Sequence, residues 1–482
     1  MNRKDLTQGG ILGNIMTFSL PYMFAYFLQI LYGLADLFVI GQFCNVDSTT
    51  AVSNGAQVMY LITCVVIGLA MGTTVCLGRA VGAKDGRRAA RIIGNTATMF
   101  LMLSVVLAGV LLFLRNHIVG WIDTPVEAVG ATRDYLTICF IGIPFIMAYN
   151  IIASIFRGMG DSKSPMYFVA IACVVNILLD YLFIGGLGLG AKGAALGTTL
   201  SQAFSVAVAL LSIRKQRRKV VSAEDVVSSD ANSSDNISSA DASSATMDAA
   251  LAVCRDDFKP QGAIIKNILK IGFPIAMQDG FIQIAFIIIT VIANGRGLYD
   301  AAAVGIVEKF IGLVFIVPSA MLSTVSAISS QNIGARNLLR AQGTLWRAMT
   351  ITTSYGVAVA LLMQWIPDVA VRLFTDDAQV IGLGAEYLRG YVWDCIFAGI
   401  HFCFSGFFTA CGYSIISFCH NFVSIMMARV PLVYLASEMY PDTLYPMGLA
   451  TCLGSVLSCV ICVVAYPWVR RKVMAAIGQS QQ

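Results

Sequence analysis

The sequence predicts an all-α polytopic membrane protein with twelve transmembrane helices, and three observations lead to this prediction. Of the 482 residues, 57% are hydrophobic and only 12% are charged, whereas a soluble domain carries about 25% charged residues. The apolar residues occur in blocks of about 20 or more, the length that a helix needs to cross a bilayer. These blocks are too long and too uniform for barrel strands, which alternate in polarity over about 10 residues.

Twelve apolar blocks define the predicted spans, six in each half of the chain. They are 16–41, 53–77, 92–114, 132–156, 165–187 and 193–213, followed by 268–293, 302–329, 345–366, 384–411, 414–436 and 446–469. We expect no cleavable signal, because Met1 to Thr7 is polar and the first apolar block is already a full span. Two lobes are therefore predicted, an N-lobe at 1–213 and a C-lobe at 267–482.

The stretch between the lobes, 214–266, differs from both in composition. It opens with the basic cluster Arg214, Lys215, Arg217, Arg218 and Lys219. From Ser222 to Ala250 it continues as a run rich in Ser, Asp and Ala, which is too polar to bury a core. We expect a disordered tether without a function of its own.

Lysine and arginine are distributed unequally between the loops on the two sides of the predicted membrane. With the N-terminus inside, the inner segments hold roughly four times as many as the outer ones, and such an excess marks the cytoplasmic side. Both termini and the tether are therefore predicted to be cytoplasmic, in a plasma-membrane protein. The net charge of +5 follows from this bias and does not indicate a nucleic-acid partner.

The two halves are related by an internal repeat. Gly82-Ala83-Lys84-Asp85 recurs as Gly334-Ala335-Arg336-Asn337, and Tyr135-Leu136 recurs at the same offset as Tyr387-Leu388. Because each half has an even number of spans, both enter the membrane from the same side, which makes a pseudo-two-fold axis along the membrane normal. Transporters built from such repeats hold substrate and ion sites near the bilayer midplane.

The first span carries a single acid, Asp36, near its middle. A carboxylate at that depth costs roughly 2.5 to 3.5 kcal/mol on insertion scales, and such acids are usually functional. Gln29, Tyr32 and Asp36 are spaced i, i+3 and i+7, so a helix places them on one face. Pro21 precedes them on the same helix and allows it to bend. The alternative is a polar stripe that joins two helices.

The fifth and sixth spans add further polar residues to the first half. Asn176 and Asp180 are one turn apart on one helical face, Thr198 follows, and Asn150 lies in the fourth span. All are oxygen-bearing groups, which suit a proton or a hard cation such as sodium rather than zinc or copper. Two buried carboxylates close together do not both ionise readily. The alternative is a structural network of hydrogen bonds between helices.

The second half lacks acids at matching positions but has polar residues of its own. Asp279, Gln283 and Glu308 are candidates for a site in this lobe, with structural and functional roles equally open for the two acids. We expect structural roles for Asp394 and Arg429, and a satisfied interior histidine at His401. The adjacent Glu308 and Lys309 project about 100° apart on a helix and need not pair.

Neither the cysteines nor the histidines indicate a metal centre. The 13 cysteines lie mostly inside apolar blocks, where they act as small apolar residues. The three histidines form no zinc motif. We therefore predict no catalytic residues, no cofactor and no resident metal, apart from a possible sodium ion at Asp36, Asn176, Asp180 and Thr198.

At this point the sequence resembles a known family. Leu20-Pro21, Gln29, Tyr32, Asp36 and Ile40-Gly41 resemble the first helix of the MATE (multidrug and toxic compound extrusion) transporters, within the MOP flippase superfamily. The run Arg157-Gly158-Met159-Gly160-Asp161 and the run Gly82-Ala83-Lys84-Asp85 are similar to cytoplasmic loops of that family. The resemblance covers both halves and leaves out the tether.

The resemblance implies a V-shaped pair of six-helix lobes that exports cationic, amphipathic drugs in exchange for protons or sodium. DinF-like members carry their cation site in the N-lobe, at the positions of Asp36, Asn176, Asp180 and Thr198, with Gln29, Tyr32 and Asn150 as its polar neighbours. NorM-like members add acids in the seventh and tenth helices. Here those neighbourhoods hold Ile282-Gln283 and Ile400-His401, which favours the N-lobe.

Three hypotheses about function, two transporters and one enzyme, follow from these patterns. The leading hypothesis is a secondary-active exporter of small organic cations or amphipathic drugs, a monomer driven by H+ or Na+, since the sequence has no ATP-binding motif. A flippase for lipid-linked oligosaccharides is the second. An intramembrane transferase is the alternative from a different class, and it would need a catalytic cluster at the membrane surface. The internal repeat argues against the enzyme.

Overall fold

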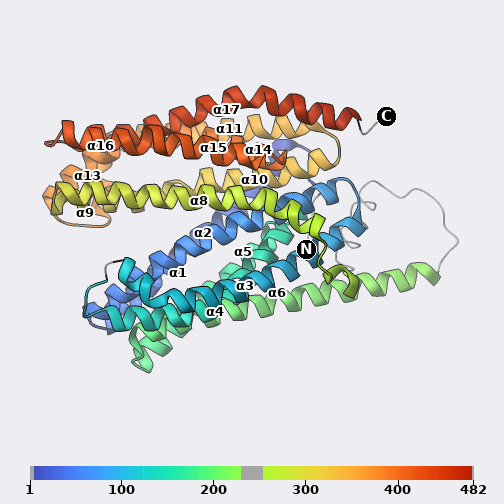
Figure 1. Ribbon diagram of the computed structural model, residues 1–482, viewed down its shortest axis with the longest axis horizontal. Helices are drawn as coiled ribbons and strands as arrows, with labels where there is room; N and C mark the ends of the chain where they lie inside the picture. The colour runs from blue at the N-terminus through green and yellow to red at the C-terminus, as the bar shows by residue number, and fades with distance from the viewer. Residues whose placement is uncertain (1–4, 123, 230–252, 480–482) are drawn as a thin grey trace. The chain divides into compact units, whose positions relative to one another are not determined.

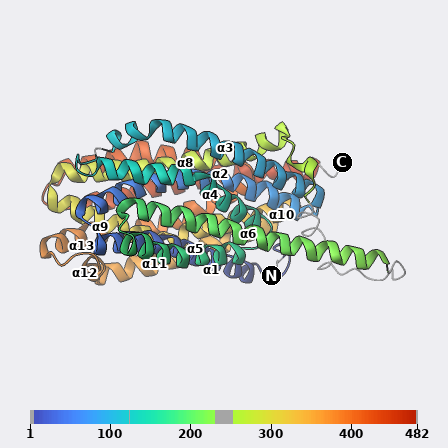
Figure 2. The same cartoon turned by 90° about the horizontal axis from the view of Figure 1, so that it is seen from below.

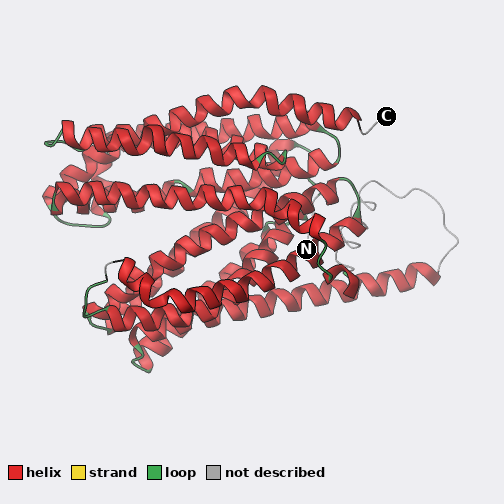
Figure 3. Cartoon of the chain, in the orientation of Figure 1, coloured by secondary structure: helices red, strands yellow, loops and turns green. Residues whose placement is uncertain are grey.

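The fold is that of a computed structural model, which describes residues 5–122, 124–229 and 253–479, with the backbone alone for 216–229. These residues are helices joined by short loops, and none of them is in a strand (Figure 3). Among these residues, eleven helices are long and apolar enough to cross a membrane, and a twelfth span is formed if the pair α13–α14, bent by 44°, is counted as one. The prediction of an all-α protein with twelve spans is confirmed.

The described residues of the first half form long helices (Figure 1) and one short π-helical segment. They are α1 (Ile11–Phe43), α2 (Val46–Gly82), α3 (Gly86–Trp121), α4 (Val129–Gly158), α5 (Lys163–Asp180), the π-helix η1 (Tyr181–Gly186) and α6 (Gly190–Ser229). The helix α4 packs against α2, α3 and α6, and α5 packs against α6. The core of this unit therefore lies around α4.

In the second half several spans are built from two or three helical pieces. The elements are η2 (Arg255–Phe258), α8 (Gly262–Arg296), α9 (Leu298–Val314), α10 (Ile316–Gly334), α11 (Leu338–Trp365), α12 (Pro367–Arg372), α13 (Ala378–Tyr391), α14 (Asp394–Ala410), α15 (Ser414–Ser424), the π-helix η3 (Ile425–Arg429), α16 (Val430–Met439) and α17 (Tyr445–Gln479). Here α14 packs against α10, α11 and α17.

Prolines inside two of these spans leave a backbone carbonyl without its usual helical N–H partner. In both cases a side-chain hydroxyl donates to that carbonyl instead. Pro274 has no N–H to donate to the carbonyl of Lys270, four residues earlier, and the Ser414 hydroxyl donates to that oxygen instead, at 3.1 Å. In the same way Pro318 frees the carbonyl of Val314, which accepts from the Tyr355 hydroxyl at 3.2 Å. The second case coincides with the break between α9 and α10 in a span that the sequence predicts as one helix.

The chain divides into two compact units, whose boundaries differ from the predicted lobes. One unit comprises residues 20–269 with the first five residues, and the other comprises 270–482 together with 6–19. The second unit gains 6–19 because Leu6, Ile15 and Phe18 pack into its apolar core. The Asn332 amide also donates to the backbone oxygen of Leu6, at 3.3 Å.

Both described ends of the predicted tether, 214–266, are structured. The helix α6 continues to Ser229 (Figure 2), η2 packs on α3, and α8 starts at Gly262. Residues 230–252, which include much of the Ser- and Asp-rich run, lie outside the described residues. The prediction of a disordered tether is therefore wrong for residues 253–266, which contain η2 and the start of α8.

A buried aspartate fixes η2 on α3. Asp257 accepts from Arg87 at 3.1 Å and from the backbone N–H of Cys254 at 2.8 Å. The Asn95 amide donates to the backbone oxygen of Asp257 at 3.1 Å, and its oxygen accepts from the N–H of Gln261 at 2.6 Å. These hydrogen bonds hold η2 and the residues beside it against α3. The composition of this polar stretch does not predict such contacts.

The internal repeat is visible in the backbone of the loops. Lys84 and Arg336 have φ values of 56° and 61°, and they are the non-glycine residues with positive φ in the described part of the chain. The residues that follow them cap the next helix: Asp85 accepts from the N–H of Arg88 and Asn337 from the N–H of Arg340. The same turn therefore closes the second span of each half, as the repeat predicts.

Candidate functional site

Asp36 lies on α1 and is almost completely buried, with 6% of its surface exposed. The Thr198 hydroxyl on α6 donates to its Oδ2 at 3.1 Å, while Oδ1 has no hydrogen-bond partner among the described residues. A buried carboxylate with one free oxygen is costly to keep charged. The side chain is therefore ready to accept either a proton or a cation.

Asn176 and Asp180 on α5 approach the Asp36 carboxylate from the neighbouring helix. Both are buried, and none of their side-chain oxygen or nitrogen atoms has a hydrogen-bond partner in the part of the chain that the structure describes. The structure thus brings together the four side chains that the sequence grouped, from three different helices. We call Asp36, Asn176, Asp180 and Thr198 the N-lobe cluster.

Two glycines make room for this cluster. A Cβ atom at Gly197 on α6 would overlap the Oδ1 of Asp180. A Cβ at Gly142 on α4 would come within 2.7 Å of the Thr199 side chain, which follows Thr198 in sequence. Both contacts are closer than packed atoms tolerate, so a side chain at either position would force the Asp180 or Thr199 side chain to shift or the helices to move apart.

The end of α5 has a further feature at the site. Asp180 is the last α-helical residue, and the chain continues directly into the π-helix η1. Wide helical turns of this kind occur mostly as short insertions and are frequent at functional sites. The π-helix starts at the carboxylate that faces Asp36.

The predicted neighbours of the cluster lie at different distances from it. Tyr32 is close to both Asp36 and Gln202, and Gln29 is next to Tyr149. Asn150 donates from Nδ2 to the backbone oxygen of Ile146 at 2.9 Å, so this amide group is used within its own helix.

Gln202 is a residue that the sequence analysis missed. It is buried, and its side-chain oxygen has no hydrogen-bond partner among the described residues. Gln202 follows Thr198 by four residues, which places both on one face of α6. The four-residue spacing from Thr198 could therefore have identified Gln202 from the sequence.

No group of three or more His, Cys, Asp or Glu side chains in the described ranges is arranged to hold a metal ion. The N-lobe cluster contributes two carboxylates, one amide and one hydroxyl. Such oxygen ligands fit sodium better than a transition metal.

The comparison with known families decides the identity of the fold. A family model described as MatE matches residues 21–182 and 274–435. The chain belongs to the MATE family. The two matched ranges correspond to the two halves of the internal repeat, so the MATE resemblance predicted from the first helix is confirmed in both.

Individual MATE relatives agree with this assignment. The "Probable multidrug resistance protein YpnP" of Bacillus subtilis is 26% identical over 437 residues, which cover 91% of each chain. The "Multidrug export protein MepA" of Staphylococcus saprophyticus is 22% identical over 410 residues, covering 84% of this chain and 83% of that protein. A crystal structure of MATE in complex with MaL6 matches with a TM-score of 0.85 at 21% identity, over 99% of this chain and 100% of that one.

MATE proteins are membrane transporters, so this chain is a transporter and not an enzyme. The hypothesis of an intramembrane transferase is therefore excluded. The likeness to the solved structure shows the fold, two six-helix lobes with twelve spans.

In the second half of this MATE protein, two of the three predicted candidates lie on one helix and the third on the next. Asp279 and Gln283 are half-buried one turn apart on α8. Glu308 on α9 accepts from the Thr290 hydroxyl at 3.1 Å through Oε2, and its buried Oε1 lacks a partner in the described ranges. Its neighbour Lys309 is exposed, and no ion pair joins the two in the described part, as their angular separation predicts.

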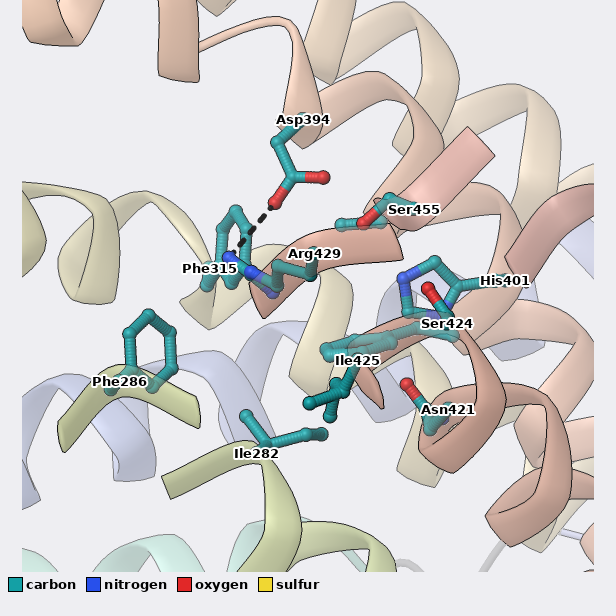
Figure 4. Close-up of a pocket in the computed structure, with 12 residues that line it drawn as sticks. Ile282, Phe286, Phe315, Asp394, His401, Asn421, Ser424, Ile425, Arg429 and Ser455 are labelled. Atoms are coloured by element: carbon teal, nitrogen blue, oxygen red, sulfur yellow. Dashed lines mark ion pairs between the residues drawn. The ribbon is translucent and has the colours of Figure 1, made fainter. Parts of the chain in front are cut away.

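Asp394 and Arg429 form a pair that the sequence did not connect (Figure 4). An Nη2 atom of Arg429 lies 3.5 Å from Oδ2 of Asp394 and donates to the Tyr391 hydroxyl at 2.6 Å. His401 lines the same pocket, and its Nδ1 has no hydrogen-bond partner among the described residues. The expectation of a satisfied histidine is therefore wrong for Nδ1, which is buried where the ring borders the pocket.

Proposed function

We propose that this MATE transporter exports cationic, amphipathic compounds in exchange for protons, with the N-lobe cluster as the coupling site. The observation that carries the proposal is the approach of Asp180 to Asp36, two buried carboxylates from different helices with unpaired oxygens. The relatives described above, a probable multidrug resistance protein and a multidrug export protein, support the choice of substrate class.

In this proposal, the charge of the N-lobe cluster couples the export of the drug to the uptake of protons. With both carboxylates ionised, their mutual repulsion is relieved by a cation, either the drug or the coupling ion. When a proton binds instead, the negative charge falls and the drug loses its electrostatic partner. One cluster then holds a proton or a cationic drug, but not both, which is the condition for antiport.

The conformational change in this proposal is a bend of α1. Pro21 lies inside α1, about four turns before Asp36, and a proline removes one backbone hydrogen bond and permits a bend. Protonation of the cluster lets α1 bend at Pro21 and reduce the space in which the drug sits. The drug is then displaced outward.

We favour the proton over sodium as the coupling ion. A proton needs only a carboxylate oxygen without a partner, and Oδ1 of Asp36 has none among the described residues. Sodium needs several oxygens that converge on one point at once, and the Thr198 hydroxyl, which donates its hydrogen to Asp36, would have to be one of them through its oxygen. The same site holds sodium if the Asn176 and Asp180 oxygens turn toward Asp36.

The transporter sits in the plasma membrane in this proposal, as a monomer with both termini on the cytoplasmic side. The bias of lysine and arginine between the loops supports this orientation. Cationic drugs then enter the cluster from the cytoplasm and leave to the outside.

The proposal is tested by ethidium efflux from membrane vesicles with pH and sodium gradients imposed separately. We expect a pH gradient alone, in sodium-free buffer, to drive efflux, because protonation of the cluster is sufficient to release the drug. Vesicles without the protein provide the background. If a sodium gradient drives efflux and a pH gradient does not, the proton assignment is wrong; if neither does, the exporter proposal fails.

A further inference from the structure

Arg157 is a buried cation near the end of α4, in the first unit, and no carboxylate compensates its charge. It is 8% exposed, its Nε has no hydrogen-bond partner, and no ion pair involves it in the part of the chain that the structure describes. Burial of a charge without an opposite charge is costly. Asp161, the acid nearest to it in sequence, instead accepts from the N–H groups of Lys163 and Ser164 at 3.0 Å.

The group that faces the Arg157 guanidinium is an aromatic ring of α1. Its Cζ lies 5.1 Å from the centre of the Tyr22 ring, within the limit of about 6 Å for a cation–π contact. Tyr22 is itself buried and packs edge-on against Tyr26. The other helices of this unit pack mainly against one another. A contact that is shielded from water, where cation–π attraction is strongest, therefore matters for the position of α1.

Tyr22 lies at the point where α1 passes from one unit to the other. The helix belongs to the second unit up to Ser19 and to the first unit from Leu20 onward. Pro21 lies at this boundary and leaves the helix short of one backbone hydrogen bond, and Tyr22 is the next residue. A bend at Pro21 that moves the Tyr22 ring away by about 1 Å takes the pair beyond the cation–π limit.

The part of α4 that carries Arg157 is held against α2. A Cβ at Gly158, the next residue, would lie 3.0 Å from the backbone oxygen of Thr74. The Thr74 hydroxyl donates to the backbone oxygen of Ser154 at 3.1 Å, about one turn earlier on α4. A movement of α1 therefore changes the contact between Tyr22 and Arg157 and leaves α4 in place.

We propose that Arg157 is a positioning residue for transport, which holds Tyr22 and stabilises the conformation of α1 seen here against bending at Pro21. The inference rests on the proposed function, in which protonation of the N-lobe cluster bends α1. With the contact intact, the bend requires the proton. Without it, α1 bends more readily at the same proton concentration, so Arg157 prevents release of the drug before the proton has bound.

The charge that triggers the bend is confined to Asp36 and Asp180. The other titratable groups that face Asp36 are Tyr32 on α1, Tyr135 and Cys139 on α4, and Cys173 on α5. From α6 it is faced by Thr198, which does not titrate. Phenols and thiols are uncharged near neutral pH, so the pH at which α1 bends reports on the two carboxylates. Loss of the Arg157 contact shifts this pH upward, because the bend then needs less proton binding.

The test follows α1 through the distance between spin labels at Leu34 on α1 and Met102 on α3, both exposed. The labels are attached to non-canonical amino acids, because the chain has 13 cysteines, and the full-length protein is titrated in lipid nanodiscs. For Arg157→Gln and Tyr22→Leu we expect the midpoint of the distance change about one pH unit above that of wild type. This corresponds to about a tenfold change in the bending equilibrium, the size expected for a cation–π contact shielded from water.

Matched variants separate this contact from a general effect on packing. Tyr22→Phe keeps an aromatic ring over Arg157 and should titrate close to wild type. Arg133→Gln removes an exposed arginine from the same helix and should titrate as wild type. The double variant Arg157→Gln, Tyr22→Leu should shift no further than either single variant, because both remove the same interaction.

The outcomes distinguish this inference from the proposed function. If the wild-type distance changes with pH and Arg157→Gln titrates identically, the inference is overturned and the proposed bend stands. If the wild-type distance does not respond to pH but Arg157→Gln and Tyr22→Leu already differ from it in alkaline buffer, Arg157 holds α1 as inferred and the proton trigger fails. If no variant differs and no pH response occurs, both fail. A shift in Tyr22→Phe as large as in Tyr22→Leu also overturns the inference, because the ring is then not the partner.

Discussion

Replacing Asp36 with asparagine is expected to reduce gradient-driven efflux to the level of empty vesicles while the protein still folds. Asparagine keeps the shape of the side chain and can still accept the 3.1 Å hydrogen bond from Thr198, so this link between α1 and α6 is preserved. It cannot bind a proton or carry a charge, so the exchange of proton for drug is lost. Ethidium efflux at equal expression measures the effect.

Asp134→Asn is the matched control for this variant. It removes a carboxylate from the same unit, but one that is partly exposed and paired with Lys192 at 3.2 Å. Exposed ion pairs contribute only about 0–1 kcal/mol, so efflux should stay close to wild type. Wild-type efflux from Asp36→Asn would show that the carboxylate is structural.

Adding one methyl group at position 197 is expected to have the second largest effect. The Cβ of Gly197→Ala would overlap Oδ1 of Asp180, so either the carboxylate turns away from Asp36 or α5 and α6 move apart. Overpacking of this kind costs about 1–3 kcal/mol. We expect efflux to fall on the order of tenfold or more, since 1.4 kcal/mol corresponds to about a factor of ten.

Gly109→Ala on α3 serves as the control for the glycine substitution. A Cβ there meets no protein atom within 4 Å, and alanine favours a helix over glycine by about 1 kcal/mol. Its efflux and melting temperature should match or exceed those of wild type. If Gly197→Ala also transports normally, the close approach of Asp180 to α6 is not needed for function.

The helices and the members of the N-lobe cluster could be predicted from the sequence because their signals are local. Long apolar blocks define spans, and an isolated acid such as Asp36 stands out within one. Asn176 and Asp180 share a helical face through their spacing alone. Their approach to α1 depends on tertiary packing, which the sequence suggested only through the resemblance.

Other features could not be predicted because they depend on contacts between distant segments. Asp394 and Arg429 come from α14 and η3, and no spacing rule connects them. The role of Gly197 depends on which atom faces it from α5. Asp257 lies in a polar stretch that its composition marks as disordered, yet α3 offers Arg87 and Asn95 as partners.

The most direct measurement of the central claim is proton release when a cation binds. Tetraphenylphosphonium is added to purified protein in weakly buffered, sodium-free solution, and the pH change is recorded with a dye. The account predicts that wild-type protein releases protons as the cation binds, because the drug displaces a proton from the Asp36–Asp180 pair, and that Asp36→Asn releases none. Binding to wild-type protein without proton release, or equal release from Asp36→Asn, would contradict the assignment of the N-lobe cluster as the coupling site.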